Sequence, residues 1–273
     1  MIKKISIYIL YALVSMFFLL PILWTISLSL KTTSEIFAFP PTFIPDEITF
    51  DNFLYVLNNT AMITYLWNSF KLVIYTVTGT LLVSIPAAYS FSRFDFKNKS
   101  ILLFIILSFQ MISPIVIGIP IYRYYSNLGL LNNYFGLAMV YIAIQIPFAT
   151  FLIKGGFDAI PRELDEAAKI DGASRFQLLH KVILPVALPP LASATIFISI
   201  NAWSQFLLPY LLLNTTSQYP VSVGILMTQG NFQQISTHYL AAASVIALLP
   251  AIIMVFLLQK FILKALTAGA VKG

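Results

Sequence analysis

The sequence predicts an all-α, polytopic membrane protein with six transmembrane helices. Of its 273 residues, 59% are hydrophobic and only 10% are charged, whereas soluble domains carry about 25% charged residues. A helix needs about 20 predominantly apolar residues to cross a bilayer. Six segments meet this requirement, and we expect them to form one membrane domain over residues 1–273: 5–30, 67–92, 101–122, 134–153, 191–213 and 239–262.

The first predicted span, 5–30, follows the charged start Lys3-Lys4 and contains no charged residue over its whole length. The hydrophobic region of a secretory signal is only about 7–15 residues long. We therefore expect an uncleaved membrane helix here rather than a signal peptide.

The next three predicted spans contain prolines, which break helices in water. In membranes such prolines are tolerated where neighbouring groups satisfy the freed carbonyls. They indicate either packing kinks or helices that bend during a functional cycle, and the sequence leaves both interpretations open: Pro86, Pro114, Pro120 and Pro147.

The last two predicted spans come from one long stretch, 182–259, that contains no Asp, Glu, Lys or Arg. The stretch is too long for a single span, and Pro209 and the polar run 214–218 divide it. We expect 214–237 to be a polar outer loop that could contact a binding protein. His238, at its end, is expected to be a surface residue.

Lys and Arg residues set the orientation of the spans, because short cytoplasmic loops are enriched in them. Six spans place both termini on the same side of the membrane. Of the 16 Lys and Arg residues, all but Lys31, Lys71 and Arg123 fall on that side. We therefore expect both termini, and the charged loop 154–190, to lie in the cytoplasm.

Several kinds of chemistry are excluded by the composition. The chain has no cysteine, which excludes disulfides and thiolate metal sites, and His180 and His238 are too few for an obvious metal cluster. It has no glycine-rich Walker A loop for nucleotide phosphates and no convincing Ser-His-Asp set or carboxylate pair. We expect no catalytic, metal or cofactor site on this chain, and no nucleic-acid partner.

The loop 154–190 carries the most specific pattern in the sequence. Pro161 suits the first turn of a helix, acidic residues follow in the early turns where they favour the helix dipole, and Gly172 suits its left-handed end. Ser174 and Gln177 fit a capping box that starts a second helix. The expected result is a helix–turn–helix elbow whose first helix places four residues on one face: Leu164, Ala167, Ala168 and Asp171.

The spacing within this elbow resembles the EAA loop of binding-protein-dependent ABC importer permeases. Glu166-Ala167-Ala168 is followed after three residues by Gly172 and later by Leu184-Pro185, with Val182 where the family usually has Ile. The run 201–209 and the tail 269–273 resemble the carbohydrate branch, in particular the smaller permease of maltose-type transporters. Within the first of these, Ser204-Gln205 replaces the usual Asn-Glu.

This resemblance implies a type I importer fold with a core permease domain at 64–259 in a bacterial cytoplasmic membrane. It implies that the elbow docks on separate ATPase subunits, which hold ATP and Mg. The further partners implied are a second permease, homologous but not identical, an extracytoplasmic solute-binding protein, a sugar substrate and membrane lipid. The residues expected to couple to the ATPase subunits are Glu166, Ala167, Ala168, Asp171, Gly172 and Ala173.

Amide side chains near mid-membrane are the candidates for a substrate path. Amides are costly in lipid unless they face protein or a water-filled cavity. They indicate either interhelical hydrogen bonds, worth about 0.6 kcal/mol on average, or a polar path for sugar hydroxyls to which Trp203 could add a ring face. The candidates are Gln110, Gln145, Asn201, Trp203 and Gln205.

Three other functions compete with a sugar permease. An ion-coupled secondary transporter should carry ionisable residues on its path, but the central regions of the predicted spans carry none. A membrane-embedded enzyme should show convergent catalytic residues. An ABC permease for a non-sugar solute would share the elbow, and only the resemblance of the run 201–209 and of the tail to the carbohydrate branch argues against it. The sequence does not identify the sugar.

Overall fold

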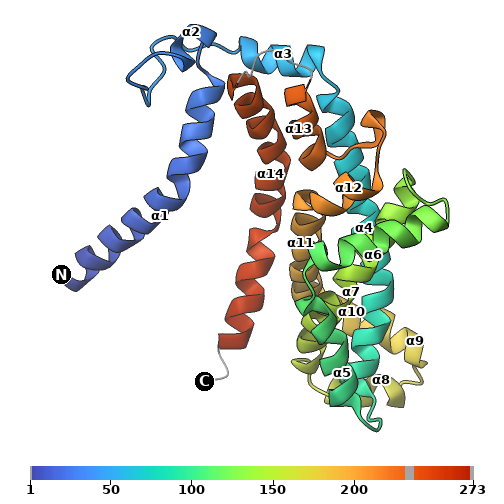
Figure 1. Cartoon of the computed structure of the whole chain (residues 1–273). Coiled ribbons are helices and arrows are strands. Elements are labelled where there is room, and N and C mark those ends of the chain that lie inside the picture. The colour runs from blue at the N-terminus through green and yellow to red at the C-terminus, as the bar shows by residue number, and fades with distance from the viewer. Residues whose placement is uncertain (1, 231–236, 271–273) are drawn as a thin grey trace.

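A computed structural model describes residues 2–230 and 237–270 of the chain, and every regular element in this part is helical (Figure 1). The all-α prediction is confirmed. The helices of at least eight residues are α1 (Ile2–Ser29), α3 (Asp51–Asn59), α4 (Met62–Arg93), α5 (Lys99–Ser108), α6 (Pro114–Asn127), α7 (Tyr134–Asp158), α8 (Glu163–Ile170), α11 (Leu188–Ser204), α13 (Val221–Gly230) and α14 (Thr237–Ala270). Shorter ones include α2 (Thr33–Ile36), α9 (Arg175–Gln177), α10 (Leu184–Val186) and α12 (Leu207–Leu212).

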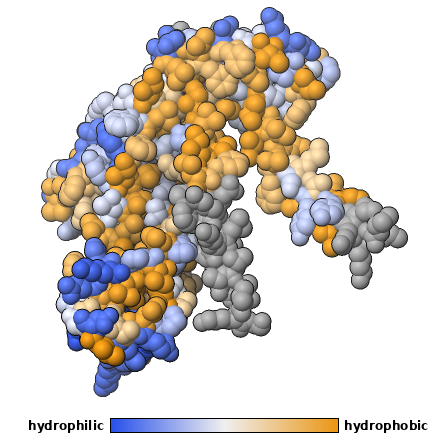
Figure 2. Space-filling view, turned by 180° about the vertical axis from the view of Figure 1, so that it is seen from behind, coloured by the Kyte–Doolittle hydropathy of each residue, from blue (hydrophilic) through white to orange (hydrophobic). Residues whose placement is uncertain are grey.

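Four helices, α1, α4, α7 and α14, are long and apolar enough to cross a membrane by themselves. Two bent helix pairs bring the number to six when each pair is taken as one span. Figure 2 shows a broad apolar surface across the middle of the molecule, with hydrophilic residues mainly toward the top and bottom of the view and a further patch at its left edge. This distribution is that of a protein surrounded by lipid across its middle.

The third predicted span, 101–122, is not one straight helix. It bends by 89° between the segments Lys99–Met111 and Pro114–Asn127. Ser113 is extended, with ψ 136°, as expected of the residue before a proline. Pro114 then begins α6, where its missing N–H costs nothing.

The fifth predicted span, 191–213, is also divided. α11 ends at Ser204, Gln205 is extended with ψ 121°, and α12 begins at Leu207. Pro209 lies in the first turn of α12, where a proline is tolerated, so it fits a new helix better than the interior of a continuous one. A second bend, of 80°, separates Arg175–Val186 from α11.

The outer segment 214–237 was predicted to be a polar loop, and this is wrong for its described part. A short 3-10 turn, Thr216–Gln218, is followed by the ten-residue helix α13. α13 packs against α4 so closely that a Cβ on Gly224 would lie 2.1 Å from the Tyr65 ring. Residues 231–236 lie outside the described residues, as do 271–273 of the tail.

The prediction of a surface position for His238 is also wrong. His238 is only 2% exposed, and its Nε2 lies 3.3 Å from the Thr33 hydroxyl in α2. Burial is possible because α2 packs against the start of α14, which the sequence pattern of either segment does not reveal.

The core has two parts, one toward each end of the bundle. The outer cluster includes Tyr65, Tyr141, Trp203 and Ala242 from α4, α7, α11 and α14. The inner cluster joins the C-terminal ends of α4 and α7 to the elbow and α11, and consists of Ala88, Tyr89, Ile153, Phe157, Ile160, Ala168, Leu178, Ile183, Ala187 and Ala194. The elbow is therefore packed onto the bundle by a core of its own.

Candidate functional site

The segment predicted to form the elbow consists of two short helices joined by a tight turn. α8 ends at Ile170 with Asp171 as its C-cap, and Gly172 follows with φ +78°. The backbone N–H of Ala173 donates to the Ala168 carbonyl at 2.9 Å, which closes the end of the helix. Nothing lies within 4 Å of a Cβ built on Gly172, so glycine is needed here for its left-handed backbone and not for space.

The second helix of the elbow begins with the predicted capping box. The Ser174 N–H donates to Gln177 Oε1 at 2.8 Å, and the Gln177 N–H donates to Ser174 Oγ at 3.3 Å. The chain then continues through a π-helical turn, Leu178–Ile183, into α10. These bonds satisfy backbone groups that a helix start otherwise leaves without partners.

α8 turns one side toward the bundle and the other toward solvent. Asp165 is 6% exposed and Ala168 is 9% exposed, and Ala168 belongs to the inner cluster. The prediction that Ala168 shares an outward face with Ala167 is therefore wrong, because the small Ala168 side chain lets α8 lie close against the bundle. Leu164, Ala167 and Asp171 are exposed as predicted.

The outward side of the elbow carries most of the predicted coupling residues. Glu166, Ala167, Asp171 and Gly172 are exposed, and Ala173 is half-buried. Two large apolar side chains beside them, Ile170 at 86% and Phe176 at 71%, are exposed as well. This mixture of small, acidic and apolar groups is suited to a protein partner that comes close to the backbone of the turn.

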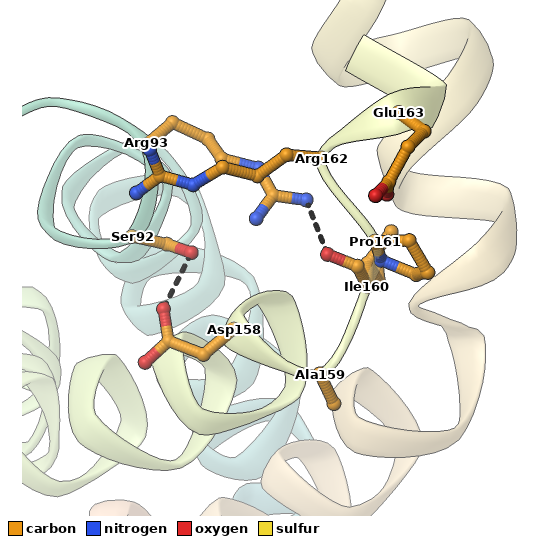
Figure 3. A pocket seen from close by; sticks show the side chains of 8 residues that line it. All are labelled: Ser92, Arg93, Asp158, Ala159, Ile160, Pro161, Arg162 and Glu163. Carbon is orange, nitrogen blue, oxygen red and sulfur yellow. Dashed lines mark hydrogen bonds between the residues drawn. The ribbon is translucent and has the colours of Figure 1, made fainter.

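The elbow joins the bundle at an open pocket of about 640 Å³, which lies among the ends of α4, α7 and α8 (Figure 3). Ser92 Oγ donates to Asp158 Oδ1 at 2.7 Å, which ties α4 to α7. Arg93 Nη2 donates to the Ile160 carbonyl at 3.1 Å, and Arg93 Nε lies 2.8 Å from Asp165 Oδ2. The pocket thus contains the link between the elbow and the spans.

A second cavity, of about 570 Å³, lies within the membrane part of the bundle. Its walls are mostly apolar and come from α6, α7 and α11 and from the bend between α5 and α6. Four of the five predicted path residues line it: Gln110, Gln145, Asn201 and Gln205. An amide carries both donors and an acceptor, so the four can exchange hydrogen bonds with a ligand rich in hydroxyls.

The fifth predicted path residue, Trp203, does not line this cavity. It is 8% exposed, and its indole N–H donates to the Ala247 carbonyl of α14 at 3.2 Å. A buried indole needs such an acceptor, and the bond ties α11 to α14. Trp203 therefore supports the wall of the cavity from behind.

The break after α11 leaves the Gln205 carbonyl without a helical partner. Ser222 Oγ in α13 donates to this carbonyl at 2.8 Å, and the Tyr141 hydroxyl in α7 lies 3.4 Å away. Irregular backbone inside a membrane protein requires such partners. The break thus positions Gln205 beside the cavity while its own backbone is satisfied.

A family model described as "Binding-protein-dependent transport system inner membrane component" matches residues 80–268. The chain belongs to this family. It is accordingly an inner-membrane permease subunit that crosses the membrane several times, and the resemblance drawn from the elbow is confirmed.

Relatives of this permease cover nearly its whole length. It is 33% identical to the trehalose/maltose transport system permease protein MalG of Thermococcus litoralis, over 99% of this chain and 98% of that protein. It is 31% identical to the sulfoquinovosyl glycerol transport system permease protein SmoH of Agrobacterium fabrum, over 93% of this chain and 89% of that protein.

A solved structure supports the fold of the permease. It belongs to a bacterial ABC transporter involved in the import of the acidic polysaccharide alginate. One of its chains is 26% identical, with a TM-score of 0.80, over 95% of this chain and 96% of that chain. The predicted type I importer permease fold is confirmed.

The sequence interpretation overlooked Arg93 and the role of Asp165. From the sequence, Asp165 is one of the acidic residues that favour the start of a helix, and Arg93 is one of the charges on the side predicted to be cytoplasmic. The available signal was the spacing along α8, since Asp165 and Ala168 are three residues apart and therefore share a face.

Proposed function

We propose that this chain is one half of the membrane channel of an ATP-driven importer for a mono- or oligosaccharide. The observation that carries the proposal is the amide-lined cavity within a bundle whose cytoplasmic end bears the elbow. The relatives with sugar cargoes in their names support the choice of solute.

In this proposal the elbow receives movement from the ATPase subunits. Ala167, Gly172 and the exposed Ile170 and Phe176 form the docking face, with Glu166 and Asp171 at its edge. Small residues let the partner approach the turn, while the two apolar side chains lose contact with water when they dock. Ala168 contributes from inside, as the contact that holds α8 on the bundle.

The cavity accepts the sugar when the spans open to it. Gln110, Gln145, Asn201 and Gln205 offer amides from four places in the chain, and Tyr125 adds an aromatic ring to the same wall. A wall with few polar groups on a mostly apolar surface is usual for small-molecule sites, where the polar groups fix orientation.

The proposed assembly contains components that this chain does not provide. Two ATPase subunits bind ATP and Mg and hydrolyse the nucleotide, so this chain has no ATPase site of its own. A second permease, homologous but not identical, completes the channel, and an extracytoplasmic binding protein delivers the sugar. Both termini lie in the cytoplasm, which agrees with the distribution of Lys and Arg.

Uptake measurements in a strain that lacks this chain test the proposal. We expect the strain to lose import of at least one labelled saccharide while uptake of amino acids, peptides and phosphate is unchanged. Restoring the wild-type chain should restore import, and restoring a Gln145→Leu variant should raise the sugar concentration needed for half-maximal uptake. Loss of peptide, amino-acid or phosphate uptake with no change for any sugar overturns the proposed solute.

A further inference from the structure

Arg93, the last residue of α4, connects three parts of the cytoplasmic end. Its Nε lies 2.8 Å from Asp165 Oδ2 in α8. Its Nη2 donates to the carbonyl of Ile160, in the segment between α7 and α8, at 3.1 Å. One planar guanidinium thus contacts the elbow helix and the segment that leads into the elbow from the end of a span. Figure 3 draws its hydrogen bond to the Ile160 carbonyl.

This ion pair differs from the others in the described part of the chain. The pairs Lys154–Asp158 and Lys99–Asp95 each join residues four apart, and their carboxylates are 43% and 81% exposed. In the Arg93–Asp165 pair both side chains are below 10% exposure, at 6% and 8%. Surface pairs contribute little, whereas removing one partner of a buried pair leaves an uncompensated charge.

A second contact attaches the other helix of the elbow to the same place. The guanidinium of Arg175, at the start of α9, lies 5.2 Å from the centre of the Phe94 ring, which directly follows Arg93. Both elbow helices therefore meet the chain at the end of α4. α4 in turn packs along α7, which carries Gln145 into the cavity.

We propose that Arg93 is a positioning residue that makes the elbow and α4 move as one body. Pulling α8 then displaces α4, and with it the neighbouring α7, instead of bending the elbow at Ile160 and Pro161. The inference rests on the proposed function, because the elbow is moved only if an ATPase subunit docks on it. A pair that merely keeps the elbow folded would affect docking, whereas a pair that transmits movement affects transport after docking.

The test compares single and double variants of the complete transporter in proteoliposomes. We expect Arg93→Gln and Asp165→Asn to keep the ATPase subunits bound and hydrolysing ATP, while sugar imported per ATP hydrolysed falls by about tenfold. The double variant Arg93→Asp with Asp165→Arg should recover part of the loss. Recovery is partial because an aspartate at position 93 cannot donate to the Ile160 carbonyl.

Asp95→Asn is the matched control, because it neutralises an exposed carboxylate two residues from Arg93 and should leave the ratio unchanged. If the neutral variants do not accumulate in the membrane, Arg93→Lys replaces them. Lysine keeps the positive charge but lacks the planar guanidinium that reaches both Asp165 and the Ile160 carbonyl. The sugar imported per ATP hydrolysed should therefore fall several-fold.

Four results overturn the inference: wild-type coupling in the single variants, wild-type coupling in Arg93→Lys, loss of the bound ATPase subunits in the single variants, or no recovery in the exchanged pair. Failure of the proposed function looks different. In that case the wild-type chain neither binds an ATPase subunit nor imports sugar.

Discussion

The turn at Gly172 shows how one backbone angle sets the shape of the elbow. A φ of +78° costs a residue with a Cβ roughly 1–2 kcal/mol, although the space around the position is open. The exposed position of the turn means that its geometry is presented directly to any docked partner. The choice of residue therefore depends on the conformation and not on side-chain packing.

We expect Gly172→Val to weaken ATPase docking and Gly172→Asn to be tolerated. Valine strains the left-handed backbone by about 1–2 kcal/mol, which corresponds to roughly a tenfold change in a docking equilibrium, whereas asparagine adopts this conformation more readily. Co-purification of the ATPase subunit with the tagged permease measures the difference. Equal loss in both variants would show that bulk at the surface, and not backbone angle, is responsible.

Side-chain direction was the part of the site that the sequence could not supply. Residue types and spacing were enough to find Gln110, Gln145, Asn201 and Gln205 and the elbow itself. Whether Ala168 faces outward, and whether Trp203 faces the cavity, depends on which neighbouring helix lies on that side. Arg93 and Asp165 are distant in sequence, so their pairing could not be inferred from either segment alone.

At the scale of the elements, α7 and α11 pack closely where Gly156 of α7 meets Pro190 of α11. A Cβ on Gly156 of α7 would lie 2.3 Å from Pro190 Cβ at the start of α11. Its neighbour Gly155 has nothing within 4 Å of the corresponding position. The close packing of α7 and α11 therefore requires Gly156 but not the adjacent Gly155, so a substitution at Gly155 serves as the control for the same substitution at Gly156.

Gly156→Val should destabilise the protein, and Gly155→Val should not. Forcing extra atoms into a packed contact typically costs about 1–3 kcal/mol, since Pro190 cannot move without shifting α11. Thermal unfolding of the purified complex in detergent should show a lower midpoint for Gly156→Val alone. An equal decrease in both variants would mean that the loss does not come from the contact with Pro190, since valine favours a helix more than glycine does.

The breaks within two predicted spans explain why the number of spans could be predicted from the sequence and the shape of each span could not. Hydropathy reports how many apolar segments exist, and six were expected. A break requires both a signal, such as Pro114 or Pro209, and partners for the freed groups, such as Ser222 and Tyr141 at Gln205. The partners come from distant helices, so the sequence did not predict a complete break. It left open only whether the prolines mark packing kinks or helices that bend during a functional cycle. The boundaries 64–259 of the core domain stay a prediction.

For the whole molecule, the elbow and the segment Thr216–Gln218 lie at opposite ends of the bundle (Figure 1). The absence of cysteine makes this separation testable by single-cysteine labelling. In intact cells an impermeant thiol reagent should label Thr216→Cys and leave Lys169→Cys unlabelled, since both positions are exposed and the proposed orientation places them in different compartments. Labelling of Lys169→Cys from outside would reverse the proposed orientation.

α1 stands apart from the rest of the bundle (Figure 1). Over the apolar part of this helix none of the side chains is buried. Its C-terminal end contacts α14 and also the chain that follows it, through Ser27 to the Phe43 carbonyl and through the Ser29 carbonyl to Asn52 of α3. The family model begins at residue 80 and therefore does not include α1.

Natural selection consequently acts on this helix differently from the others. A substitution in α4 or α7 must fit a core that the chain itself provides, whereas a substitution in α1 must suit whatever lipid or protein lies alongside. Its sequence is free to diverge between relatives at constant hydrophobicity, or to change together with that of a neighbouring subunit. α1 is thus the helix in which a change of sequence leaves the interior of this permease least altered.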